Sequence, residues 1–235
     1  DPGVYELYTN EQNNDKFTAK LDWNINDKNK ISIPYNYLKS FRDINTSGSN
    51  ARGTSPQRGP TATSLPFSNM RYRQFNNINS VVLELNSRFG SKASNNLTVG
   101  YTAFRDYRST FGTPFPVVDI EDGNGANYIS LGSEPFSGLN LLNQDIYQFS
   151  DNFTYYMGKH TLTFGTANEI YKFSNGFAQF FYGQFRYANM NDFVNAMNGT
   201  GGNPLLYQLT YSAIPGNPRP TADLKAVNLS FYAQD

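Results

Sequence analysis

The chain has 235 residues, of which 16% are charged and 16% aromatic, and its 19 basic and 19 acidic side chains cancel. This balance excludes the basic face that a nucleic-acid partner requires, and the absence of cysteine excludes disulfides and thiolate chemistry. No apolar run approaches the roughly 18 residues of a transmembrane helix. A mean hydropathy of -0.57 normally indicates a soluble protein, but a membrane β-barrel escapes this inference because its strands are apolar on one face only.

Strict alternation of apolar and polar residues predicts two strands close to the N-terminus. The alternation runs through residues 17–25, stops at a polar turn over residues 26–30, and resumes over residues 31–37. Pro34 falls inside the second strand and requires a bulge, a strand edge or a break there, because proline cannot donate a ladder hydrogen bond. The apolar residues of this hairpin are Phe17, Ala19, Leu21, Trp23, Ile25, Ile31, Ile33, Tyr35 and Tyr37.

The same pattern predicts two further hairpins and one single strand. The hairpins extend over residues 81–103 and 149–170, and the strand extends over residues 227–233. Between the hairpins lie long stretches that hold most of the glycine and proline, and we expect these stretches to be loops. One loop segment begins with Asn and Asp and ends before Asn-Gly, which predicts a short helix. The expected loops are 39–74, 106–146 and 174–223, and the expected helix is 189–197.

Short turns that alternate with long loops are typical of an outer-membrane barrel, which has tight periplasmic turns and long extracellular loops. The alternating segments also have about the 9–11 residues that a tilted membrane strand needs. A β-sandwich alternates too, but its turns recur about every 8–12 residues, and these do not. The predicted fold is therefore all-β, an antiparallel transmembrane β-barrel fragment with long extracellular loops. It spans residues 1–235 with about six or seven strands, and we expect a partial barrel because both ends look cut.

In such a barrel the apolar residues face lipid and the residues between them face the lumen. A lipid-facing charge at mid-membrane costs about 2–4 kcal/mol, which explains why the alternation is strict. The residues expected to face the lumen are Lys20, Asp22, Glu84, Arg88, Thr163 and Glu169.

An acidic, glycine-containing segment in the second long loop is the best candidate for a metal site. Asp119, Glu121, Asp122 and Asn124 could supply oxygen ligands to Ca²⁺, although their spacing misses the EF-hand pattern. The alternative is an acidic turn without metal, and no other cofactor is indicated.

Two further sets of loop residues are candidates for binding. Clustered aromatic rings after Gly176 could stack on a sugar or peptide ligand, or could pack against neighbouring loops. Arginines in and near the first long loop could contact the phosphates of lipopolysaccharide, or could be solvated. The aromatic residues are Phe177, Phe180, Phe181, Tyr182, Phe185 and Tyr187, and the arginines are Arg52, Arg58, Arg71 and Arg73.

Enzymatic candidates are few, and we predict no enzyme. His160 is the one histidine of the chain, and it falls in a predicted turn between Lys159 and Thr161. A serine hydrolase needs its histidine beside a serine and oriented by a carboxylate, for which a surface turn is a poor place.

Five segments carry a family resemblance through their order and spacing: residues 14–24, 122–129, 133–137, 158–165 and 230–235. The first resembles a hairpin opening, and the second and third resemble one loop, of TonB-dependent receptors of Bacteroidota, in particular the large Oar-like group. Residues 158–165 resemble a hairpin of the wider family, and residues 230–235 resemble the start of a strand.

The resemblance implies a twenty-two-stranded barrel with an N-terminal plug, which a TonB-contacting segment links to the TonB complex. TonB would move the plug and let a bound ligand through. The plug and the TonB-contacting segment are not visible in this sequence. Implied partners are TonB, outer-membrane lipid, lipopolysaccharide and a surface lipoprotein. The alternatives are a passive porin, a surface adhesion or secretion barrel, and a secreted glycan-binding β-sandwich.

Overall fold

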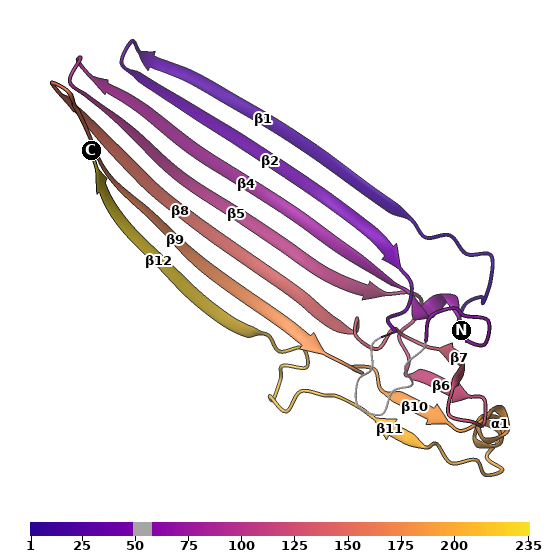
Figure 1. Cartoon of the computed structure of the whole chain (residues 1–235). Coiled ribbons are helices and arrows are strands. Elements are labelled where there is room, and N and C mark those ends of the chain that lie inside the picture. Colours follow the sequence, from indigo (N-terminus) through magenta and orange to yellow (C-terminus); the bar gives the residue numbers. More distant parts are fainter. Residues whose placement is uncertain (49–57) are drawn as a thin grey trace.

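The computed structural model describes residues 1–48 and 58–235, and its largest element is an antiparallel sheet of seven long strands (Figure 1). Consecutive strands of this sheet are also neighbours in space, so the sheet is a simple meander. In spatial order its strands are β1 (Gln12–Asn26), β2 (Asn29–Ile44), β4 (Tyr72–Phe89), β5 (Ala93–Thr110), β8 (Leu139–Met157), β9 (His160–Ala178) and β12 (Ala222–Gln234).

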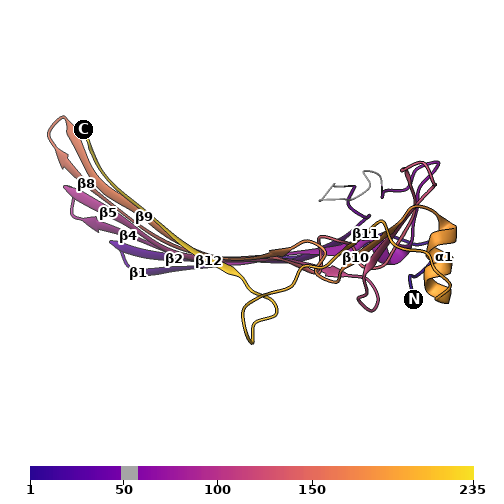
Figure 2. The same ribbon diagram turned by 90° about the horizontal axis from the view of Figure 1, so that it is seen from below.

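Three tight turns join the strands at one end of the sheet, as the sequence predicted. Only Asp27 and Lys28 lie between β1 and β2, and the backbone amide of Lys28 donates to the Asn26 side chain at 2.9 Å. The other two turns begin with Gly90 and Gly158, whose φ values of 65° and 62° favour glycine. Figure 2 shows these turns at one end of a curved sheet and α1 with β10 at the other.

Strand pairing divides the side chains of the sheet into two faces, because directly paired residues project to the same side. One row of pairs runs from Leu21 through Ile33 and another from Leu83 through Val99 to Phe149, so the predicted apolar set shares a face. We call it the apolar face, and its members are largely exposed, as Phe231 is at 80%. The opposite, polar face carries Asp22 with Ser32 and Glu84 with Thr98.

Toward the long loops the character of the two faces is exchanged. The apolar face becomes polar at a level that we call the polar boundary, which consists of Lys39, Asn77, Arg105, Asp145, Lys172 and Lys225. At the same level the polar face carries a mostly apolar row of paired residues, Leu38, Ile78, Phe104, Gln144, Phe173 and Leu224, in which Gln144 of β8 is the polar member. The strands therefore extend several residues beyond the segments predicted from the alternation, which followed a single apolar face.

Pro34 interrupts one ladder without shifting its register. On one side Pro34 is paired with Lys20 of β1. On the other side the pairing of β2 with β4 passes from Ser32–Glu84 to Tyr35–Val81, and neither Ile33 nor Pro34 is paired there. The missing amide hydrogen of proline accounts for this local break, which is one of the three solutions expected from the sequence.

The long loops contain more regular structure than the one short helix expected in them. They form a second sheet in the order β11-β10-β6-β7-β3, which mixes parallel and antiparallel pairs (Figure 1). We call this sheet and its connections the loop assembly. Its strands are β3 (Leu65–Pro66), β6 (Val117–Glu121), β7 (Asn127–Leu131), β10 (Gln184–Tyr187) and β11 (Leu206–Gln208).

Two short helices complete the loop assembly. The 3-10 helix η1 (Ser68–Met70) precedes β4, and α1 (Met190–Asn198) follows β10. The Asn189 side chain caps α1 by accepting from the Asp192 amide, and Gly199 ends it at a φ of 67°. The predicted loop helix is thus confirmed. In the part of the chain that the structure describes, no helix is long and apolar enough to cross a membrane.

Candidate functional site

The loop assembly has a buried core of its own, although it is made from three separate loops. Met70, Val117 and Phe180 each come from a different loop and pack together with almost no exposed surface. Phe180 has a φ of 54°, and its amide donates to the carbonyl of Pro135 at 2.6 Å. A residue other than glycine rarely adopts this backbone conformation, so tertiary packing holds Phe180 in it.

Asp119 on β6 links all three loops through its carboxylate. Its two oxygens accept hydrogen bonds from Arg58 at 3.1 Å, from Ser130 at 2.7 Å and from Gln184 at 2.6 Å. Gln184 in turn accepts a hydrogen bond from Gln208 of β11. Since Arg58 and Asp119 are both fully buried, their charges compensate each other in a site that water does not reach.

The four residues predicted to bind Ca²⁺, Asp119, Glu121, Asp122 and Asn124, have other partners in the structure. The Asp119 carboxylate is occupied by Arg58, Ser130 and Gln184, and Glu121 lies 3.5 Å from Arg186. Asp122 accepts from the amides of Asn124 and Ala126, which forms a turn and lowers the pKa of that carboxyl. Within residues 1–48 and 58–235, no three acidic or histidine side chains come together to hold a metal ion. In this structure Asp119 and Asp122 bind different partners, and Asp122 forms an acidic turn; a calcium site at these residues stays a prediction.

The aromatic cluster divides between packing and exposure. Phe180 and Tyr187 are buried inside the loop assembly, so neither is available to a ligand. Phe185 packs on Tyr207 of β11, with ring centroids 4.8 Å apart. Phe181 lies against Tyr182 and under the guanidinium of Arg219. Of the six rings predicted to bind ligand, Phe177 is the most exposed, at 57%.

Glu134 is a buried carboxyl in the loop between β7 and β8. One of its oxygens accepts from the amide of Phe136 at 2.9 Å and from the hydroxyl of Ser137 at 2.6 Å. Burial raises the pKa of this carboxyl above its usual range, and these hydrogen bonds only partly offset the effect. The loop assembly thus contains a buried carboxyl whose pKa is raised.

The polar face of the long sheet carries a network of hydrogen-bonded side chains. Gln148 donates to Glu169 at 3.1 Å, and Ser80 lies 2.9 Å from Thr102. The pairing places all the residues predicted to face the lumen on this face: Lys20, Asp22, Glu84, Arg88, Thr163 and Glu169. That this face lines a lumen stays a prediction.

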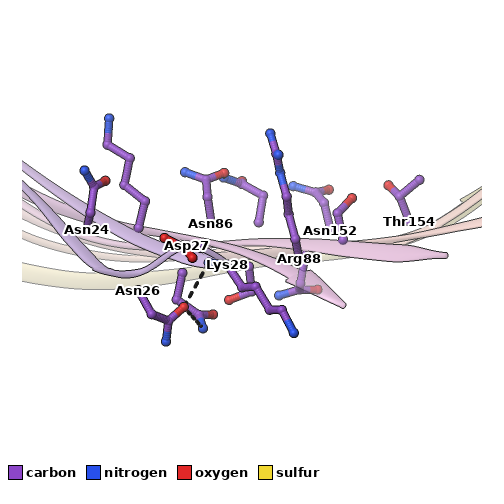
Figure 3. Close-up of a pocket in the computed structure, with 14 residues that line it drawn as sticks. Asn24, Asn26, Asp27, Lys28, Asn86, Arg88, Asn152 and Thr154 are labelled. Carbon is purple, nitrogen blue, oxygen red and sulfur yellow. Dashed lines mark hydrogen bonds between the residues drawn. The ribbon is translucent and has the colours of Figure 1, made fainter. Parts of the chain in front are cut away.

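Near the turns the polar face has a hollow of about 710 Å³. Asn24, Asn86 and Thr154 stand on one side of the strands, and Asn26 projects to the other side (Figure 3). The side-chain amide nitrogen of Asn96 donates to the side-chain oxygen of Asn86 at 2.9 Å between β5 and β4. Amides and hydroxyls both donate and accept, so this surface suits a polar protein segment or solute.

The arginines proposed to contact lipopolysaccharide lie elsewhere than expected. Arg58 is buried against Asp119, and Arg71 is buried with its guanidinium against the rings of Tyr8 and Phe111. Arg73 bonds to Asp43 at 2.7 Å. Arg52 lies outside the described residues. Arg58 and Arg71 are thus not exposed to contact lipopolysaccharide phosphates in this structure, because the loops pack around both side chains.

His160 begins β9, beside the tight turn, and its Nδ1 atom lies 2.5 Å from the Asp235 carboxylate. Both side chains are exposed, as expected for a turn residue.

Sequence reasoning missed Ser130 and Gln184, because nothing local marks a residue that bonds to another loop. It also missed Lys172 and Lys225, although a signal was present. Lys172 follows Ile170 by two residues, and Lys225 precedes Val227 by two residues. Each lysine therefore stands where the apolar alternation of its strand stops.

Comparisons with known proteins agree with this geometry. A family model described as outer membrane beta barrel domain matches residues 3–235. A search of curated proteins gave no match. The crystal structure of the outer membrane transporter YddB from Escherichia coli is similar, with a TM-score of 0.63 and 15% identity over 95% of this chain and 25% of that chain. This chain thus spans about a quarter of the length of that transporter, and at this identity the likeness shows the fold alone.

Proposed function

The chain belongs to the outer membrane beta barrel domain family and is located in the outer membrane, and from this premise we propose that it forms part of the wall of a TonB-dependent receptor. The receptor would bind a ligand at the cell surface and import it with energy passed on by TonB. The secreted β-sandwich does not fit this family, nor does it fit one seven-stranded antiparallel meander.

The observation that carries the proposal is the loop assembly. Three loops that could each have been independent are joined through Asp119 into one folded body with a buried core. Binding sites are commonly built on loops that a rigid scaffold positions, and a preformed shape lowers the entropy lost on binding. The loop assembly therefore suits recognition of a ligand at the end of the barrel that long loops occupy.

Strand geometry supports a larger closed barrel. β1 and β12 form the two edges of the sheet, and a membrane strand cannot leave its backbone groups unpaired in lipid. In the proposed receptor, neighbouring barrel strands pair with both edges. The similar solved structure is that of an outer membrane transporter, so its fold is one that serves transport.

The polar face would then surround the lumen. Its amides, hydroxyls and charged pairs, such as Lys20 with Asp22 at 3.2 Å, would contact a plug domain near the turns. The mostly apolar row from Leu38 to Leu224 lies nearer to the loop assembly and would contact less polar parts of a ligand on its way in. A surface lipoprotein and the TonB complex are the protein partners that the family resemblance implies.

Uptake in cells tests the proposal against a passive porin of the same architecture. Radiolabelled siderophores, cobalamin, oligosaccharides and peptides would be offered to cells with the gene intact, with the gene deleted, and with tonB deleted. We expect at least one compound to accumulate only when both genes are intact, and a protonophore to abolish the accumulation. Uptake that needs this gene but neither TonB nor the proton-motive force would contradict the proposal and indicate a passive pore.

A further inference from the structure

Two lysines lie directly opposite each other on the apolar face, at the level where that face becomes polar. Lys172 of β9 is paired with Lys225 of β12, so both side chains leave the sheet on the same side. Both side chains are exposed. Like charges in directly opposite positions destabilise a sheet, and an anion held between them would offset the repulsion.

The lysine pair borders the surface that contacts lipid. Two residues closer to the turns, Ile170 is paired with Val227 and also with Tyr147. The Lys172 ammonium lies 5.2 Å from the centroid of the Tyr147 ring, so its alkyl stem and its charge are both held at this border. Because long loops mark the extracellular side of a barrel, the border faces the outer leaflet.

Neighbouring carboxylates neutralise the pair only in part. Asp145 is paired with Lys172, and its carboxylate also accepts from Tyr101 and from Arg105, each at 2.6 Å. Asp223 precedes Lys225 by two residues on the same face. Among the described residues here, Lys172, Lys225 and Arg105 stand against these two carboxylates, which leaves one net positive charge.

A cleft of about 430 Å³ lies at this position and is lined by both lysines. Asn143 and Ser174, also in its lining, add neutral hydrogen-bond donors, and the carboxylates of Asp145 and Asp223 line it as well. Ammonium groups with neutral donors beside them match the oxygens of a phosphate group. An apolar surface directly below matches the acyl chains that such a headgroup carries.

We propose that Lys172 and Lys225 bind the phosphate of an outer-leaflet lipid headgroup, as found in lipopolysaccharide, while its acyl chains pack on Ile170 and Val227. Lys39 and Arg105 continue the polar boundary across β2 and β5 and would contact further headgroups. The site rests on the outer-membrane location and is independent of TonB-driven import. Failure of the lipid-binding test would therefore not contradict TonB-driven uptake, and failure of the uptake test would not contradict lipid binding.

Binding by the purified, delipidated full-length protein tests the site. The protein would be titrated in detergent with lipopolysaccharide, with the same lipopolysaccharide after enzymatic dephosphorylation, and with inorganic phosphate. The variant K172Q/K225Q removes the pair, and K92Q/K159Q removes two exposed lysines from the tight turns at the other end of the sheet as a matched control. We expect K172Q/K225Q to weaken binding of lipopolysaccharide by about tenfold or more, since two charge-assisted hydrogen bonds are lost.

The control variant should bind lipopolysaccharide like the natural protein. The dephosphorylated lipid should bind the natural protein as weakly as intact lipopolysaccharide binds K172Q/K225Q. Equal binding by K172Q/K225Q and the natural protein would overturn the proposal. So would inorganic phosphate that competes at the same concentration as the lipid, because the site would then be a general anion site. The heat-dependent gel shift of each variant checks that the barrel has formed, and K172R/K225R should retain binding. If K172Q/K225Q does not form a barrel, K225Q alone is measured against the same criteria.

Discussion

The Nε atom of Arg58 lies 3.1 Å from both carboxylate oxygens of Asp119, and both side chains are completely buried. These residues are 61 positions apart in the chain and belong to different loops. Ser130 and Gln184 complete the surroundings of the carboxylate, so the folded shape of the loop assembly depends on one buried charge and its partners.

Replacing Asp119 should unfold the loop assembly while the long sheet stays formed. Asp119→Ala removes the carboxylate that is bonded to the buried Arg58 guanidinium, and breaking a buried ion pair costs about 3–5 kcal/mol. Hydrogen exchange measured by mass spectrometry should show faster exchange in β6, β7 and β10, with β4 and β5 unchanged. Asp122→Ala, three residues away on an exposed turn, is the matched control and should alter only its own turn. Unchanged protection of β10 in Asp119→Ala would contradict the role given to this carboxylate.

Glu134 should make the stability of the loop assembly depend on pH. Its pKa is raised by burial above the ordinary value of 4.5, so the folded state binds a proton more readily than the unfolded state. The contribution of Glu134 is therefore favourable at low pH and is lost as the pH rises from the ordinary pKa through the raised one. Exchange of the Phe136 amide, corrected for its intrinsic rate, should speed up over that window.

Glu134→Gln separates this effect from other titrations. The amide has the shape of the neutral carboxyl, and its oxygen can still accept from Phe136 and Ser137. We expect the variant to protect the Phe136 amide equally well across the window. A pH dependence that persists in Glu134→Gln would assign it to another group.

Arginine substitutions at two adjacent positions should show which face of the long sheet contacts lipid. Val99 belongs to the apolar face and Thr98 to the polar face, since Val99 is paired with Phe149 and Thr98 with Ser150. Val99→Arg should destabilise the barrel by about 2–4 kcal/mol if it lies near mid-membrane, and Thr98→Arg should cost clearly less. The temperature of the heat-dependent gel shift in vesicles measures both. A larger effect of Thr98→Arg would reverse the assignment of the faces.

Tyr232 covers Gly165 on the neighbouring strand, and its hydroxyl reaches Asn152 on the strand beyond. A Cβ atom at position 165 would collide with the Tyr232 ring. Gly165→Ala should therefore cost about 1–3 kcal/mol, a typical penalty of overpacking. The penalty should largely disappear in the background of Tyr232→Ala, and a double-mutant cycle on thermal unfolding quantifies the coupling. Additive effects of the two substitutions would show that the ring moves aside freely.

Much of the long sheet could be predicted because its causes are local. Alternation with a period of two marks one apolar face, and Gly90 and Gly158 mark turns through their backbone freedom. The N-cap Asn189 and the terminal Gly199 likewise indicated α1. The sequence did not predict the strand ends beyond Leu38 and Lys39 and the equivalent positions. There the apolar residues pass from one face of the sheet to the other, so the alternation continues with apolar and polar positions interchanged.

The candidate site was less predictable, as Asp119 illustrates. Its neighbours Glu121 and Asp122 are close in sequence and suggested shared ligation of a metal. In the folded chain Asp119 is turned toward Arg58 and Gln184, which are 61 and 65 residues away, while Asp122 closes a turn of its own. Proximity along the chain therefore did not predict which carboxylates act together.

The sequence by itself determined the class of the protein, the hairpins of the long sheet and the residues that share each face, because period-two alternation and turn chemistry act over a few residues. Only the tertiary structure decided that three loops form one body, that Arg58 and Asp119 are buried together, and that Lys172 is opposite Lys225. These contacts join segments far apart in the chain, and their free energy depends on burial and charge compensation that exist only after the strands have paired.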